Sequence, residues 1–527
     1  MDKTTLASTW IKSVKGYLSE HRVEMVLLFV ILVVGAFLRL YKIDGYMTFL
    51  GDEGRDMMVV RRLLVERDLI FVGPGTSVGN MYLGPFYYYL IAPFLWLFNF
   101  SPVGPSVMVA LFGVATIFLV WYVVVHLFPV KDINWGALFA ALFYAIAPTV
   151  IILSHSSWNP NIMPFFALLV VLSLWKVWQE KKLLWLIPLG IFYAIVLQSH
   201  YLGLILLPVI AVFWIATFFD LLKEKGKKLW RFVLATGGLI TSFVLLMSPL
   251  ILFDAHYNWR NIKSMQLFFT QSGSNLSFNL LDLIRRIPIA FNNVFVSLMS
   301  ARKENMTVYV ALPIIFLLVW FLFINRQKFS SARLKGYLFI FTWFVFGILG
   351  FTFYKQPIYD HYFGFLFPAP FILLGAILQD IYFSGKKWIK LCVPLLVVGI
   401  LLPSILNTPL KQAPGYQLRR SINIASKIVD ESGGESFNLA VIADRNYEGA
   451  YQYFLELWQA PLLMIDPQKY GETLAEQLFV VCEYEDQTEC QPTSNPKAEV
   501  ANFGWSKIDK SWNIDGLVLF RLVHTKV

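Results

Sequence analysis

The sequence contains few charged residues. Asp, Glu, Lys and Arg make up 15% of its 527 residues, whereas 57% are hydrophobic and 17% are aromatic. This composition excludes an ordinary soluble enzyme of this length, because such a chain would expose far more charge to water. Apolar runs of about 20 residues, the length needed to cross a bilayer, recur from Val23 to Leu406. The sequence therefore predicts a polytopic α-helical membrane protein.

Two further features are missing or scarce. Residues 1–22 lack a short apolar core with a small-residue cleavage site, so residues 23–41 are expected to form an uncleaved first span. Only three cysteines are present. Cys392 lies in an apolar run, whereas Cys482 and Cys490 lie close together in the polar tail. An extracytoplasmic tail would permit a disulfide between these two, and the sequence leaves open whether they pair.

Eleven apolar runs are predicted to span the membrane. The formal charge of +10 comes from Lys and Arg in short loops between these runs, which is an orientation signal and not a nucleic-acid-binding surface. The run 84–98 is short, is interrupted by Pro85 and Pro93, and is rich in aromatic residues, so it is expected to lie in the membrane interface. The predicted spans are residues 23–41, 105–127, 135–153, 161–178, 183–199, 201–219, 230–252, 307–325, 334–352, 362–381 and 388–406.

With eleven spans, the basic loops all lie on one side of the membrane, which is expected to be the cytoplasmic side. The chain then divides into three regions. Residues 1–22 form a cytoplasmic N-terminus, and residues 23–406 form a transmembrane domain with outer loops 42–104 and 253–306. Residues 407–527 form an extracytoplasmic α/β domain, in which 419–430 has helical periodicity and 437–443, 477–482 and 516–523 have strand patterns. The expected location is a bacterial plasma membrane.

The first outer loop concentrates acidic residues. Asp52, Glu53 and Asp56 lie within five residues, with Arg55 among them, directly before a helical pattern that runs to Arg67. Asp52 occupies the expected N-cap position, where free N–H groups and the helix dipole stabilise a carboxylate. Taken alone, the pattern indicates a capped surface helix.

Polar clusters at the outer ends of other spans fall on the same predicted face. A single His or Tyr at a span end is usually an interfacial anchor, so a functional interpretation depends on several of them converging. Carboxylates, imidazoles, a Lys and an Arg on one face suit a reaction that needs a base and cations for an anionic leaving group. The candidate residues are His155, Asn159, His200, His256, Arg260, Lys355, His361 and Tyr362.

These motifs resemble the GT-C glycosyltransferases, in the branch of the protein O-mannosyltransferases and the lipid A aminoarabinose transferases. The Asp52-Glu53 pair after the first span resembles the Asp-Glu motif of that branch, and residues 84–90 (Gly-Pro-Phe-Tyr-Tyr-Tyr-Leu) are similar to its Pro-Pro-Leu-Tyr-Tyr segment. Residues 154–164 occupy the place of a motif reading roughly Ser-x-x-Ala-Arg-x-Asp-x-Pro, with Asn159 or Asn161 where Asp is usual. Lys355, His361-Tyr362 and Pro368 are similar to a Lys…His-Tyr…Pro segment of narrower spacing. The resemblance covers about residues 20–410.

The resemblance implies inverting transfer of a hexosyl or pentosyl group from a polyprenyl-phosphate donor to an acceptor outside the cytoplasm. It implies that Asp52 acts as general base, or binds the acceptor or a metal, with Glu53 in support. No metal ligand is assigned and a divalent metal stays open, because Asn replaces an acidic residue and family members differ in metal dependence. The sugar, and whether the acceptor is a protein, a lipid or a glycan, stay open. Candidates for the lipid phosphate are Arg260, Lys355 and His361, and the other candidate substrate contacts are Arg55, Asp56, Tyr87, His155, Asn159, His200, His256 and Tyr362.

Two other classes of function are weighed against this one. A transporter or lipid flippase also needs polar groups in a helical bundle, but it tends to place charges near the middle of spans and to contain internal repeats. This sequence shows its polar clusters at span ends and no repeat. A non-catalytic scaffold with a partner-binding tail would leave the crowded acids of the first outer loop unexplained.

Overall fold

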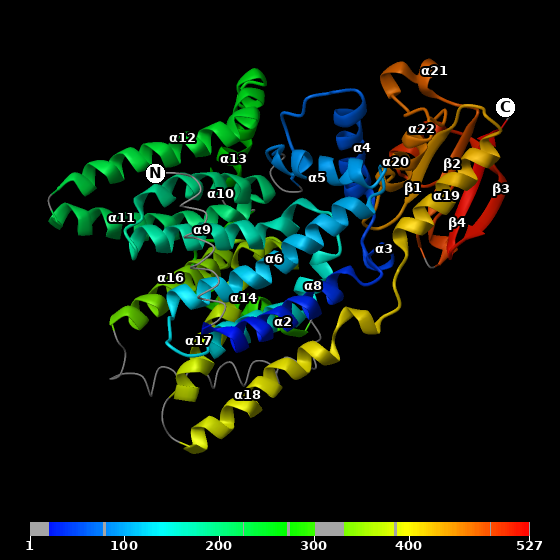
Figure 1. The fold of residues 1–527 in the computed structure, drawn as a ribbon. Helices are drawn as coiled ribbons and strands as arrows, with labels where there is room; N and C mark the ends of the chain where they lie inside the picture. Colours follow the sequence, from blue (N-terminus) through cyan, green and yellow to red (C-terminus); the bar gives the residue numbers. More distant parts are fainter. Residues whose placement is uncertain are drawn as a thin grey trace, which may run out of the picture.

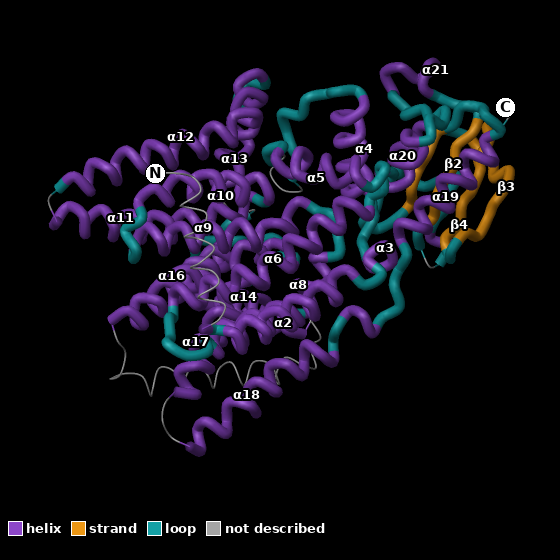
Figure 2. The backbone as a smooth tube through the Cα atoms, in the orientation of Figure 1, coloured by secondary structure: helices purple, strands orange, loops and turns teal. Residues whose placement is uncertain are grey.

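The computed structural model describes residues 20–76, 81–224, 226–270, 275–300, 331–383, 387–484 and 486–525. A bundle of long helices makes up most of the molecule, and a small sheet with its own helices lies at one end of the bundle (Figure 1). Helices dominate this part of the chain, and the strands are confined to the C-terminal region (Figure 2). The predicted class, a polytopic helical membrane protein with a small C-terminal α/β domain, is confirmed.

Most helices of the bundle match predicted spans, whereas the helix Leu280–Ser300 lies in the predicted outer loop 253–306. Within the described residues, six helices are long and apolar enough to cross a membrane, or eight if two bent pairs each count as one span. The predicted span 307–325 lies outside the described residues. The bundle contains α2 (Arg22–Leu40), α6 (Val103–Leu127), α7 (Trp135–Ile146), α8 (Pro148–Ser154), α9 (Met163–Trp178), α10 (Leu186–Ser199), α11 (Leu206–Glu224), α12 (Lys227–His256), α14 (Leu280–Ser300), α16 (Ser331–Phe353), α17 (Pro368–Phe383) and α18 (Lys387–Leu406).

A proline breaks the span formed by α7 and α8. The two helix axes differ by 60°, because Pro148 has no N–H to donate and disfavours a helical conformation at Ala147. The fully buried Arg39 of α2 donates to the carbonyl oxygens of Ala145 (2.8 Å) and Tyr144 (3.3 Å) in the last turn of α7. Carbonyl groups in the last turn of a helix lack intrahelical partners. The buried guanidinium therefore supplies the hydrogen-bond donors that the end of α7 needs.

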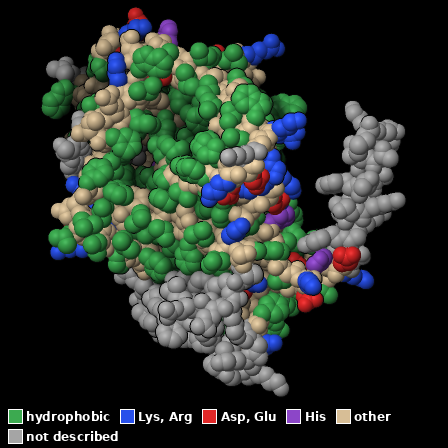
Figure 3. All heavy atoms as spheres, turned by 90° about the vertical axis from the view of Figure 1, so that its left-hand side faces the viewer, with side chains coloured by type: hydrophobic (Ala, Val, Ile, Leu, Met, Phe, Trp, Pro, Cys, Tyr) green, Lys and Arg blue, Asp and Glu red, His purple; other side chains and the backbone are tan. Residues whose placement is uncertain are grey.

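The bundle has a buried centre and an apolar outer surface. In the segment Asn159–Trp178, which contains α9, 83% of the span is buried, against 6% for α12. The exposed side chains of α12 include Trp230, Leu245 and Leu252, as expected of a helix that faces lipid tails. Figure 3 views the end of the bundle remote from the sheet, where hydrophobic side chains cover much of the surface. Lys and Arg side chains stand at several points on it, some of them in a cluster with Asp and Glu to the right of the centre.

Shorter helices lie in the segments that connect the long helices of the bundle. These are α3 (Ile43–Tyr46), α4 (Gly51–Val65), α5 (Phe86–Leu97) and α13 (Arg260–Thr270). With 12 residues, α5 is about 18 Å long, which is too short for a hydrocarbon core of about 30 Å. Its length fits the predicted interfacial helix at 84–98, whose position in the membrane stays a prediction.

The C-terminal domain contains one four-stranded sheet in the order β1-β2-β4-β3. The strands β1 (Asn438–Ile442) and β2 (Gln477–Cys482) are parallel, whereas β4 (Leu517–His524) is antiparallel to both β2 and β3 (Ser506–Ile514). The three predicted strands and the predicted helix, α19 (Gln417–Ser432), are confirmed. The strand β3 was missed because it is an exposed edge strand rich in Lys, Ser and Asp. The remaining helices are α20 (Gly449–Leu457), α21 (Tyr470–Thr473) and α22 (Ala498–Phe503).

A disulfide joins the end of β2 to the segment before α22. It pairs Cys482 with Cys490, both fully buried beside Val500 and Phe503. The pairing that the sequence left open is thus present, and it fits a domain that folds in an oxidising compartment.

The predicted orientation can be tested by labelling from outside the cell. A cysteine in place of the exposed Ser511 on β3, in a Cys392→Ala background, is expected to react with a membrane-impermeant maleimide in intact cells. A cysteine in place of the exposed Lys228, in the first turn of α12, is expected to react only after permeabilisation, because basic loops stay in the cytoplasm. The reverse pattern of labelling would show that the orientation is wrong.

Candidate active site

The acidic helix α4 begins without a cap of its own. Its N-cap is Leu50, so the predicted N-cap at Asp52 was wrong, and Asp52 is the second residue of the helix. The Leu50 N–H donates to Glu53 Oε2 (3.1 Å), and the Gly51 N–H donates to the Asn446 side-chain oxygen (2.8 Å). These two bonds satisfy the N–H groups of the N-cap residue and of the first helical residue, which a capping side chain does not reach.

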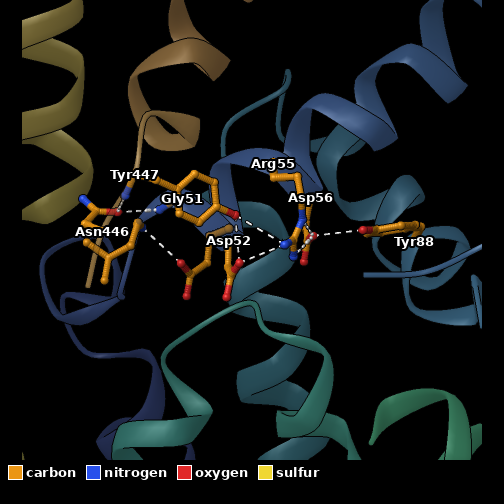
Figure 4. Close-up of polar contacts among 9 residues, drawn as sticks. Gly51, Asp52, Arg55, Asp56, Tyr88, Asn446 and Tyr447 are labelled. Atoms are coloured by element: carbon orange, nitrogen blue, oxygen red, sulfur yellow. Dashed lines mark hydrogen bonds and ion pairs between the residues drawn. The ribbon is translucent and has the colours of Figure 1, made fainter. Parts of the chain in front are cut away.

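Arg55 links two of the acids of α4 (Figure 4). Its Nη1 donates to Asp52 Oδ1 (2.8 Å), and its Nε and Nη2 donate to Asp56 Oδ1 (3.0 and 2.8 Å). The three-residue spacing places Asp52 and Arg55 on the same face of the helix. Tyr88 of α5 donates to Asp56 Oδ1 (3.1 Å), and Tyr447 of the C-terminal domain donates to Asp52 Oδ1 (2.8 Å).

The three acids of α4 differ in how far their side chains are buried. The Asp52 side chain is 42% exposed, whereas the side chain of Asp56 is fully buried. Burial raises the pKa of Asp56 to about 6, against the attraction of Arg55. Burial, with repulsion from the neighbouring carboxylates, raises the pKa of Glu53 to about 8. At neutral pH Glu53 therefore keeps its proton, and Asp52 is the acid of this group that a substrate can reach.

Two consecutive tyrosines of α5 connect α4 to the loop between α8 and α9. While Tyr88 bonds to Asp56, the Tyr87 hydroxyl lies 2.8 Å from the hydroxyl of Ser157. Ser156 in the same loop accepts from the Thr48 N–H (3.0 Å), just before α4. The acids and the loop at 154–161 thus belong to one hydrogen-bonded layer.

The candidates in this loop make contacts that hold the bundle together. The buried Asn159 donates from Nδ2 to the Ser199 carbonyl oxygen (2.7 Å). His155 Nε2 lies 3.1 Å from the Leu38 carbonyl oxygen, and burial lowers the pKa of His155 to about 4. His155 is therefore neutral at physiological pH and joins the loop to α2. The amide of Asn159 suits its position because a carboxylate there would face another acceptor.

The structure brings His200, His361 and Tyr362 together. The ring centroids of His200 lie 5.9 Å from His361 and 4.7 Å from Tyr362, and the Trp158 ring lies 4.2 Å from His361. Burial lowers the pKa of His200 to about 4. This cluster joins the end of α10 to the 3-10 turn Asp360–Leu366 through the loop that also contacts Tyr87.

A small cavity with a mainly apolar lining lies beside this cluster. Its lining includes His361 together with Ser154 and Asn161 of the same loop. Asn161 donates to the Ser156 carbonyl oxygen (2.9 Å), but its Oδ1 is buried without a partner in the described part of the chain. Asn161 thus lines the cavity and, among the described residues, has one unsatisfied acceptor.

The candidate cations Arg260 and Lys355 follow two of the long helices of the bundle. Arg260 is exposed at the start of α13, where its guanidinium lies 5.5 Å from the Tyr82 ring centroid. The Asn261 side-chain amide accepts from the Tyr82 N–H and donates to the Tyr82 carbonyl oxygen, each at 2.8 Å. Lys355 is exposed after α16, and its backbone N–H donates to the Asn275 carbonyl oxygen (2.8 Å). His256 is exposed at the end of α12.

Sequence reasoning missed three residues of the acidic network. Tyr88 carried a signal, because it adjoins Tyr87 in the Tyr-Tyr-Tyr run. Asn446 and Tyr447 carried none, because they lie almost 400 residues from α4 in a segment without a motif. The described residues contain no group of three His, Cys, Asp or Glu arranged to hold a metal ion.

Comparison with known proteins agrees with the resemblance. Residues 83–251 match a family model described as dolichyl-phosphate-mannose-protein mannosyltransferase. ArnT from Cupriavidus metallidurans bound to undecaprenyl phosphate is 13% identical, with 94% of this chain and 97% of that chain covered and a TM-score of 0.56. Its apo structure has the same identity and TM-score, with 97% and 98% covered. No protein of curated function matches the sequence.

A more distant likeness extends to oligosaccharyltransferases. AglB from Archaeoglobus fulgidus, in complex with an inhibitory peptide and a dolichol-phosphate, is 10% identical, with 87% of this chain and 69% of that chain covered and a TM-score of 0.51. The chain is thus an integral membrane protein with the GT-C fold, similar to ArnT and to the protein mannosyltransferases.

The raised pKa of Glu53 predicts a dependence of stability on pH. The pKa of Glu53 rises from an ordinary 4.5 to about 8. The contribution of protonated Glu53 to the free energy of unfolding is therefore fully present below the ordinary pKa and is lost as the pH rises through about 8. Glu53→Gln, which keeps an oxygen for the Leu50 N–H, is therefore expected to raise the melting temperature relative to wild type at about pH 9 and much less at about pH 5.

Thermal unfolding in detergent at the two pH values measures this effect. Glu66→Gln is the matched control, because Glu66 is exposed at the far end of the same helix. A gain for Glu53→Gln that is equal at both pH values, or larger at the lower one, would contradict a neutral Glu53.

Proposed function

We propose that the protein is a membrane glycosyltransferase that moves a sugar from a polyprenyl-phosphate donor to an acceptor hydroxyl on the extracytoplasmic face, with inversion. The observation that carries the proposal is Asp52, a part-exposed carboxylate held by Arg55 at the start of α4. Support comes from the GT-C fold and from two similar structures that contain undecaprenyl phosphate or dolichol-phosphate.

The chemistry requires one base and one anionic leaving group. Asp52 takes the proton of the acceptor hydroxyl while the acceptor oxygen forms a bond to C1 of the sugar. The bond between C1 and the phosphate oxygen breaks, and the polyprenyl phosphate leaves with the bonding electrons. A single displacement of this kind inverts the configuration at C1. A positioned general base typically contributes about 10²- to 10⁴-fold to the rate.

The other acids of α4 have supporting roles in this proposal. Neutral Glu53 accepts from the Leu50 N–H at the start of the helix. Asp56 orients Arg55 by accepting two hydrogen bonds from its guanidinium. Arg55 in turn fixes the carboxylate of Asp52. This division follows from burial, because the two covered acids cannot exchange protons with a substrate as readily as the part-exposed one.

The phosphate of the donor needs cations near the lipid. Arg260 and Lys355 are exposed and charged, and they border the loops that lead to α5 and to His361. His155 and His200 are neutral because burial lowers the pKa of each to about 4, so in this proposal they position loops and do not bind phosphate as cations.

The lipid chain needs an apolar surface that is open to the bilayer. The first half of α14 exposes Leu280, Leu281 and Ile284, while Arg286 on the same helix donates to the Tyr354 carbonyl oxygen (2.7 Å). This amphipathic helix therefore joins lipid-facing side chains to the residue before Lys355. The arrangement suits a donor whose tail lies in lipid and whose headgroup lies among the loops.

The proposal predicts that Asp52→Asn reduces transfer by at least about 100-fold, because the amide cannot accept a proton. The assay incubates purified protein with a panel of polyprenyl-phosphate sugars and measures release of polyprenyl phosphate. Asp44→Asn is the control, since Asp44 is an exposed acid on α3 in the same outer loop.

Both variants are expected to melt within a few degrees of wild type, since each replaces an exposed or part-exposed side chain by an isosteric one. Near-normal turnover by Asp52→Asn would remove Asp52 as the base. A wild-type protein that releases no polyprenyl phosphate from any sugar donor in the panel would contradict the proposed function.

A further inference from the structure

The C-terminal domain touches the start of α4 through two opposed glycines. A Cβ atom on Gly54 would lie 2.2 Å from the carbonyl oxygen of Gly449, and one on Gly449 would lie 2.3 Å from the carbonyl oxygen of Gly51. Neither position has room for a side chain, so the backbones of α4 and α20 meet directly. This contact sets the register between the acidic helix and the segment just before α20.

The segment before α20 is itself held by the sheet. The Asn446 amide donates to Glu483 Oε1 (2.7 Å) just after β2, and the Tyr451 hydroxyl donates to the same oxygen (2.6 Å). The Asn446 side-chain oxygen accepts from Gly51 N–H and from Tyr447 N–H (2.9 Å). One asparagine therefore ties the first turn of α4 to the backbone of Tyr447.

Tyr447 meets the acid that the proposed function uses. Its hydroxyl lies 2.8 Å from Asp52 Oδ1 and 3.3 Å from Arg55 Nη1 (Figure 4). Within the described part of the chain, the hydrogen bonds to the Asp52 carboxylate all end on Oδ1. Because the side chain is 42% exposed, Oδ2 is the oxygen that remains for the acceptor.

We infer that Tyr447 is a positioning residue of the transferase site, so that the C-terminal domain supplies part of the active site. The inference rests on the proposed function, because it needs Asp52 to act as the base. The Tyr447 hydroxyl and Arg55 hold Oδ1 from two sides and thereby aim Oδ2. Removal of the hydroxyl leaves one donor, and the carboxylate can then turn about its Cβ–Cγ bond.

The interface has other contacts that could dock the domain without Tyr447. Glu456 of α20 pairs with Arg61 (3.1 Å) and Arg62 (2.6 Å) of α4, and the Tyr453 hydroxyl donates to the Phe100 carbonyl oxygen (2.5 Å). Tyr453 thus makes the same type of cross-domain bond as Tyr447 but reaches no acid of α4. It provides a matched control for a role that is only structural.

The test compares Tyr447→Phe with Tyr453→Phe in the full-length protein, using a polyprenyl-phosphate sugar that the wild type turns over. Tyr447→Phe is expected to lower kcat by about 10- to 100-fold, the usual effect of losing a hydrogen bond to a charged group, with KM for the donor unchanged. The acid limb of its pH–rate profile is expected to move to higher pH, because the ionised carboxylate has lost a donor. Tyr453→Phe is expected to keep both kcat and the profile.

Each other outcome has a defined meaning. Wild-type kcat and pH profile in Tyr447→Phe would overturn the inference while leaving the proposed function in place. Equal losses in both variants, with equal falls in melting temperature, would reduce Tyr447 to a docking contact and also overturn it. A wild-type protein without turnover of any donor would overturn the proposed function, and the inference with it.

Discussion

The organisation of the site depends on the N–H groups at the start of α4, which have no acceptors in the backbone of the helix. A helix exposes free N–H groups in its first turn, and they need acceptors. The Leu50 N–H bonds to Glu53 within the helix, and the Gly51 N–H bonds to Asn446 of the C-terminal domain. The acid-bearing helix, and with it the geometry of Asp52, is therefore complete only when the bundle and the sheet are packed together.

Differences in burial give three neighbouring acids three different properties. Asp52 faces outward and keeps an open oxygen, Asp56 is covered by Tyr88 and paired with Arg55, and Glu53 is covered and neutral. The same three carboxylates on an exposed helix would repel one another with little to distinguish them. The tight contact between Gly54 and Gly449 helps to create the difference, because it closes one side of the helix to water.

Local sequence signals predicted the elements whose pattern is set by lipid or by a buried face. Apolar runs located the described spans, and the buried strand Gln477–Cys482 was predicted with its observed bounds. The strand Ser506–Ile514 was missed because an exposed edge needs no apolar pattern. The N-cap was misplaced because the acceptor for Gly51 comes from Asn446. No local pattern reports a contact between residues so distant, so Tyr447 was also beyond sequence reasoning.

Asn159, one of the two Asn residues that could stand where the motif has Asp, can be explained by the donors and acceptors around it. Asn159 is buried and donates to the Ser199 carbonyl oxygen. A carboxylate in its place would set two acceptors against each other, and burial would add the cost of covering a charge. The loop at 154–161 is therefore built to join spans, with His155 donating to the Leu38 carbonyl oxygen in the same way. Within this layer the carboxylates are left to α4, and the part-exposed one among them is Asp52.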